Sequence, residues 1–145
     1  MRNVYLRLAS VLVQLFLLMF LVPGVHEQIH MVVADWLGVK GYVLFSGIEW
    51  GFFAYQDYAS VLLWQDLLIG FSAGFFVAVV FGILWGIQHW QARKNLSELD
   101  TAMIFASITI WQLSYAFADA LDRWADPAQL IAVILSSVAI VVLYG

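Results

Sequence analysis

The sequence predicts an all-α integral membrane protein: a single domain over residues 1–145 with about four transmembrane helices and a short hairpin or re-entrant segment at residues 41–58. Hydrophobic residues make up 64% of the chain and charged residues only 11%. The apolar runs are long enough to cross a hydrocarbon core of about 30 Å. They are continuous rather than alternating, which argues against a closed barrel. The lipid bilayer is therefore the first expected partner.

The first apolar run predicts one long helix over residues 4–37. Pro23 interrupts the run, so we expect a kink there, because proline removes an internal hydrogen bond and displaces the preceding turn; the alternative is that two shorter helices meet at this point. The helix should end near Gly38, since glycine is common just after a helix. Arg2 and Arg7 resemble the start of a signal peptide, but the apolar run that follows is longer than a signal peptide's and indicates a retained membrane helix.

Residues 41–58 are apolar and aromatic but too short for a comfortable crossing, and Glu49 lies in their middle. We expect a hairpin, a re-entrant loop or an interfacial segment, with a short extra span as the alternative. Three further helices are predicted at about residues 60–90, 101–125 and 128–144. Small residues on the first of them let a neighbouring helix approach closely, and these are Gly70, Ser72, Ala73, Gly74, Gly82 and Gly86.

Charge distribution gives an expected orientation. If residues 41–58 do not cross, the basic residues near the N-terminus and in the polar connector 91–100 share one side of the membrane. The positive-inside rule then places both termini in the cytoplasm, and we expect the cytoplasmic membrane of a prokaryote. The chain has no cysteine, which excludes disulfides, thiolate ligands and iron–sulfur clusters. With a net charge of −4 and no basic face, no nucleic-acid partner is expected.

The most informative stretch is His26-Glu27-Gln28-Ile29-His30, which has the pattern H-E-x-x-H. Two histidines four residues apart stand on one face of a helix, so both rings can reach one metal ion. The intervening glutamate can lie beside the metal and take a proton from a bound water. The chain has only three histidines, and ionisable residues in a membrane segment are functional candidates. We therefore predict a Zn²⁺ site here, with a structural polar cluster as the alternative.

Catalytic zinc usually has three protein ligands and one position open to water. Asp119 is the expected third ligand, because in a four-span arrangement its depth in the membrane matches that of the motif. Asp122, on the same helix face, is the alternative, and Glu49 is another candidate. Both aspartates could instead be water-facing residues at a helix end. Tyr115 could donate to an oxyanion or simply lie at the membrane interface, where His89 is also expected.

The motif and its surroundings resemble the site-2-protease-type membrane zinc metallopeptidases. The resemblance covers about residues 15–122 and includes the pentapeptide, Ala34, Leu37-Gly38-Val39, the stretch 41–58 and the small-residue-rich stretch 67–74. It implies an intramembrane peptidase in which His26, His30 and Asp119 bind zinc and Glu27 activates water against a membrane-embedded peptide. Asp119 is followed by Ala120, where the family has glycine.

A second interpretation is non-catalytic. A small bundle with seven Trp, eleven Phe and six Tyr could be an accessory or structural subunit of a larger membrane complex. Its small-residue faces would pack on partner helices, and His26 and His30 would donate hydrogen bonds across an interface or bind a structural metal. Haem or quinone binding is less favoured, because two histidines on adjacent turns of one helix suit one small ion better.

Overall fold

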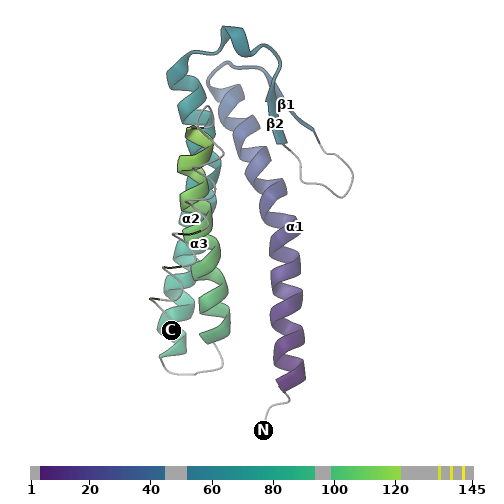
Figure 1. The fold of residues 1–145 in the computed structure, drawn as a ribbon, viewed down its shortest axis with the longest axis vertical. Coiled ribbons are helices and arrows are strands. Elements are labelled where there is room, and N and C mark those ends of the chain that lie inside the picture. The colour runs from purple at the N-terminus through teal and green to yellow at the C-terminus, as the bar shows by residue number, and fades with distance from the viewer. Residues whose placement is uncertain are drawn as a thin grey trace.

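The computed structural model describes residues 4–44, 52–93 and 99–121, together with three helical positions further on, Ile134, Val138 and Val142. Over these residues the chain is mostly helical, as predicted. Three long helices, α1 (Val4–Trp36), α2 (Leu63–Ala92) and α3 (Leu99–Ala120), account for most of it (Figure 1). A two-stranded antiparallel sheet of β1 (Gly41–Leu44) and β2 (Phe52–Tyr55) lies beside the C-terminal half of α1, and a 3₁₀ turn, Tyr58–Ser60, leads on to α2.

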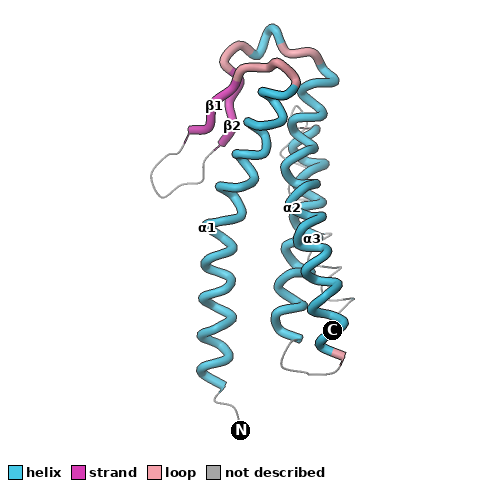
Figure 2. Tube along the Cα trace, turned by 180° about the vertical axis from the view of Figure 1, so that it is seen from behind, coloured by secondary structure: helices cyan, strands magenta, loops and turns pink. Residues whose placement is uncertain are grey.

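Helix α1 is the single long helix that the sequence predicts, with Pro23 inside it. It bends in its middle part, so that its C-terminal half leans toward α2 (Figure 2). Its end has the glycine turn expected at Gly38, which has a φ of 73°. There the N–H groups of Gly38 and Val39 donate to the carbonyls of Asp35 and Ala34 at 3.0 and 2.8 Å. The turn satisfies two terminal carbonyls of the helix and leads the chain into β1.

Among the structures expected for residues 41–58, the hairpin is the one observed, with β1 and β2 paired antiparallel. The residues between the strands, Glu49 among them, lie outside the described part of the chain. Beyond β2, the hydroxyls of Tyr55 and Tyr58 donate to the two carboxylate oxygens of Asp66 at 2.8 and 2.9 Å. These bonds fasten the hairpin to the first turn of α2.

Helices α2 and α3 pack against each other at glycines, as the small residues of α2 predict. A Cβ atom added at Gly74 would lie 2.6 Å from both the backbone nitrogen of Ala116 and the carbonyl oxygen of Gln112. One added at Gly70 would lie 2.7 Å from the carbonyl oxygen of Asp119. No side chain fits at such distances, so both positions require glycine. These glycines contact the chain's own α3 rather than a partner helix.

The C-terminal half of α1 joins this pair through a small apolar core. Its buried members are Val33, Ala34, Val39 and Ile69. Side chains from the hairpin complete it: Phe53 and Tyr55 pack against the same cluster. The core therefore holds α1, β2 and the start of α2 together beside the predicted metal ligands.

Helices α2 and α3 are long and apolar enough to cross a membrane, judged by length and composition. The count of four spans stays a prediction. The last predicted span, residues 128–144, lies outside the described residues except for the three helical positions named above. The expected orientation, with both termini in the cytoplasm, also stays a prediction.

Candidate metal centre

His26 and His30 lie one turn apart on one face of α1 and are almost completely buried, with 3% and 6% of their surfaces exposed. Their rings meet edge to face with centroids 4.7 Å apart, and their Nε2 atoms are 3.0 Å apart. The two imidazoles therefore converge on one point, as the spacing of the motif predicts.

Asp119 reaches the same point from α3. Its Oδ2 atom lies 2.9 Å from His26 Nε2 and 3.6 Å from His30 Nε2. Gly70 allows this approach, because a side chain there would collide with the backbone of Asp119. The structure thus brings together the three residues predicted as metal ligands. The alternative ligand, Asp122, lies outside the described residues.

The other nitrogen of each imidazole has its own hydrogen-bond partner. His30 Nδ1 lies 2.7 Å from the carbonyl oxygen of Ile69 in α2, and a carbonyl can only accept. His26 Nδ1 lies 3.0 Å from Oε1 of Gln112 in α3, which accepts in the same way. When both Nδ1 atoms carry the proton, both Nε2 atoms present lone pairs toward the Asp119 carboxylate. Metal-binding histidines generally have such an acceptor on their second nitrogen.

The spacing of these three acceptor atoms suits one zinc ion. Zinc–ligand distances of about 2.0–2.1 Å with tetrahedral angles put neighbouring ligand atoms about 3.3 Å apart. The separations in this site are 2.9, 3.0 and 3.6 Å, on either side of that value. Two imidazoles and one carboxylate form a donor set known from catalytic zinc sites, and they leave a fourth position for water.

Glu27 lies beside this centre, partly buried. Its Oε2 atom accepts a hydrogen bond from the backbone N–H of Phe53 in β2 at 2.6 Å. One of its carboxylate oxygens lies within 4.8 Å of a ring nitrogen of His26 and of His30, so Glu27 could itself contribute a ligand. Asp119 has an oxygen at 2.9 and 3.6 Å from the two Nε2 atoms, and we take it as the third ligand. With Asp119 in that role, Glu27 would remain beside the centre as a proton acceptor.

Aromatic rings cover the two histidines. The ring of Tyr115 lies edge to face against His26 with centroids 5.4 Å apart, and the ring of Phe53 lies 6.0 Å from that of His30. These contacts restrict the access of bulk water to the centre. A hydrogen bond from Tyr115 to an oxyanion stays a prediction. His89 lies in the last turn of α2, at the far end of that helix from Ile69, and its interfacial role also stays a prediction.

Three groups at this site were not predicted from the sequence. One is Gln112, a buried polar residue placed two turns before Asp119 on the same face of α3. Its position in an otherwise apolar stretch, in register with Asp119, is a signal that could have identified it. The others are two backbone groups, the carbonyl of Ile69 and the N–H of Phe53, which no sequence pattern marks.

Comparisons of the chain with protein-family models, with curated proteins and with solved structures gave no match. The resemblance to site-2-protease-type metallopeptidases therefore rests on the motif and its surroundings. The geometry of the metal centre is the stronger basis for a functional proposal.

Proposed function

We propose that the protein is a membrane-embedded zinc-dependent peptidase that hydrolyses a peptide bond in or near the bilayer. The observation that supports it most is the convergence of His26 Nε2, His30 Nε2 and Asp119 Oδ2 within 3.6 Å of one another. Three acceptor atoms at these hydrogen-bonding distances repel one another unless a proton or a metal ion lies between them, and their convergence from two helices suits a metal ion. Burial among apolar helices increases that repulsion, because water no longer screens it.

The residues around the centre have distinct tasks in this proposal. Zinc held by His26, His30 and Asp119 would supply Lewis acidity to a water molecule and to the peptide carbonyl. Glu27 accepts the proton of the attacking water and passes it to the leaving amine. The Phe53 N–H holds one oxygen of Glu27 and leaves the other available for that proton. The aromatic cover over the histidines excludes competing water.

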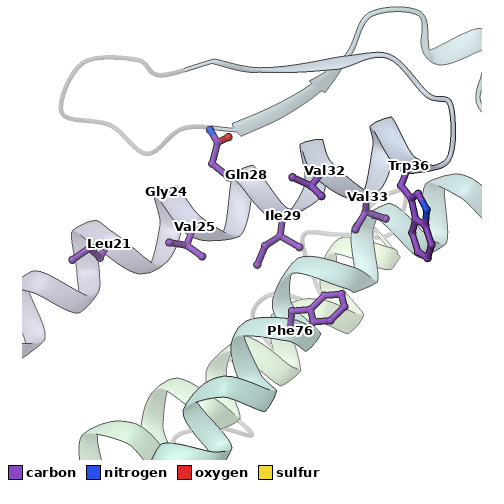
Figure 3. A pocket seen from close by; sticks show the side chains of 9 residues that line it. All are labelled: Leu21, Gly24, Val25, Gln28, Ile29, Val32, Val33, Trp36 and Phe76. Carbon is purple, nitrogen blue, oxygen red and sulfur yellow. The ribbon is translucent and has the colours of Figure 1, made fainter.

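A second candidate function is that of an accessory subunit with a structural metal. A groove of about 670 Å³ beside α1 and α2 is compatible with it and with the peptidase function (Figure 3). The groove is lined by Leu21, Gly24, Val25, Gln28, Ile29, Val32, Val33, Trp36 and Phe76. It is centred on Val25 and Val32, roughly a third of a turn around α1 from the histidines. An apolar membrane segment fits this lining, either a peptidase substrate or a helix of a partner protein.

Metal content is the first test of the centre. We expect about one zinc ion per detergent-purified chain. Substitution of a predicted ligand, His26→Ala or Asp119→Ala, should abolish zinc binding, whereas His89→Ala should retain it because His89 lies at the far end of α2. Wild-type protein without zinc would contradict the proposal. Retention of zinc in Asp119→Ala would move the third ligand to another carboxylate.

Glu27→Gln separates the two candidate functions. The amide keeps the size of the side chain and an oxygen that can accept from Phe53 N–H, but it cannot take a proton from water. In a peptidase this variant binds zinc and retains its fold but loses hydrolysis of co-reconstituted membrane-spanning peptides. A general acid–base group typically contributes about 10²–10⁴-fold to the rate. If wild-type protein and Glu27→Gln both bind zinc and neither cleaves any peptide, the structural-subunit function is favoured.

A further inference from the structure

The two histidines of the centre are oriented by two different kinds of acceptor. His30 is held by a backbone carbonyl, that of Ile69, which also accepts a hydrogen bond from the Ser72 hydroxyl at 2.7 Å. His26 is held by a side chain, Gln112, through an Nδ1–Oε1 distance of 3.0 Å. The orientation of His26 therefore depends on one residue that can be substituted.

Gln112 is a buried residue, and a buried amide side chain is costly unless it has a hydrogen-bond partner. Only 3% of its surface is exposed, and burying an amide without a hydrogen bond costs about 1–3 kcal/mol. Its backbone is fixed by the close approach of α3 to Gly74, where any added side chain would meet the Gln112 carbonyl oxygen. The amide oxygen is thus aimed at His26 by a rigid helix contact.

We propose that Gln112 is a positioning residue that keeps His26 in the neutral tautomer needed for metal binding, with the proton on Nδ1. A neutral imidazole carries one proton, on either Nδ1 or Nε2. With Gln112 accepting from Nδ1, the Nε2 lone pair stays available to the metal. Without Gln112, the proton moves to Nε2, because Asp119 Oδ2 lies 2.9 Å away and accepts it. The resulting His26–Asp119 hydrogen bond occupies both ligand atoms and competes with the metal. This inference rests on the proposed metal centre.

Zinc affinity of the full-length protein in detergent, measured by competition with a chromophoric chelator, tests the proposal. Gln112→Met keeps the length and apolar packing of the side chain but offers only a weak acceptor. It should weaken zinc binding by about 10–100-fold, the usual effect of losing a partner of a metal-binding histidine. Gln112→Glu restores a strong oxygen acceptor and should bind within about threefold of wild type or more tightly. Gln88→Met is the matched control, since the Gln88 oxygen has no hydrogen-bond partner among the described residues.

The variants distinguish positioning from packing. A purely structural role would weaken binding equally in Gln112→Met and Gln112→Glu, and that result would overturn the proposal. Wild-type affinity in Gln112→Met would overturn it as well. If the wild-type protein itself binds no zinc, the metal centre and the role of Gln112 both fail. Zinc-binding wild type with an unaffected Gln112→Met contradicts the role of Gln112 alone.

Discussion

The seam between α2 and α3 and the attachment of α1 to these helices are built in different ways. The seam is formed by small residues, and at Gly70 and Gly74 the two backbones leave no room for a side chain. Helix α1 approaches this pair with its C-terminal half and separates from it toward the N-terminus (Figure 1, Figure 2). The polar side chains His26 and His30 lie at this approach.

The difference suggests which region depends on a ligand. The α2–α3 seam is held by close van der Waals contact at small residues and by aromatic contacts such as Phe71–Phe117 and Phe81–Phe105. The attachment of α1 includes the contact between His26 Nε2 on α1 and Asp119 Oδ2 on α3. A cation between them would join α1 to α3. We therefore expect the seam to be insensitive to metal and the attachment of α1, which the apolar core around Val33 and Ile69 also supports, to be strengthened by it.

The largest predicted effect, a loss of stability, comes from a substitution that blocks the close packing of α2 against α3. In Gly74→Leu the new side chain meets backbone atoms of Gln112 and Ala116, which cannot move aside without separating the helices. Because overpacking commonly costs about 1–3 kcal/mol and sometimes more, we expect a loss of about 3 kcal/mol or more, together with loss of zinc binding. Unfolding in detergent by titration with a denaturing surfactant measures it. Gly86→Leu is the control, since nothing lies within 4 Å of that position, and equal losses in both variants would contradict the packing argument.

If the centre holds zinc as proposed, its removal should act on the attachment of α1. Ligand binding stabilises a fold by about 2.7 kcal/mol when free ligand exceeds its Kd about a hundredfold, so chelation should lower stability by a similar amount. Hydrogen exchange should then rise in the C-terminal half of α1 and in the hairpin, while the α2–α3 seam keeps its protection. His26→Ala serves as the control, because a chain that cannot bind zinc shows no change on chelation. Faster exchange spread evenly over all three helices would contradict the distinction between the regions.

The features predicted correctly depend on local chemistry or on helix periodicity. The start and end of α1 follow from one apolar run and from Gly38, and the observed helix covers Val4–Trp36. The histidine pair follows from the spacing of the motif. The nearness of Asp119 to the histidines follows from its expected depth in a four-span arrangement, and the structure places its Oδ2 atom 2.9 Å from His26 Nε2, while its role as a metal ligand stays a prediction.

The features that were missed depend on how elements meet in space. The Ile69 carbonyl and the Phe53 N–H are backbone groups, which every residue except proline carries in full, so no sequence pattern distinguishes them. The hairpin was one of several structures expected for residues 41–58, because short apolar stretches with glycines suit more than one of them. What selects it here is contact with α1, through Glu27 and the core around Val33 and Ile69.

The smallest predicted effect concerns the turn that leads from α1 to the hairpin. Gly38 has a φ of 73°, and a Cβ added there meets nothing within 4 Å, so the cost of Gly38→Ala is purely conformational. We expect a loss of about 1 kcal/mol in the free energy of unfolding. Gly24→Ala should have the opposite sign, a gain of about 0.5–1 kcal/mol, because Gly24 lies inside α1 and its added Cβ also meets open space. Unfolding titrations on the two variants compare a glycine in the left-handed conformation just after α1 with a helical glycine inside it. A loss of stability in both would mean that alanine disturbs the attachment of α1 through packing rather than through backbone conformation.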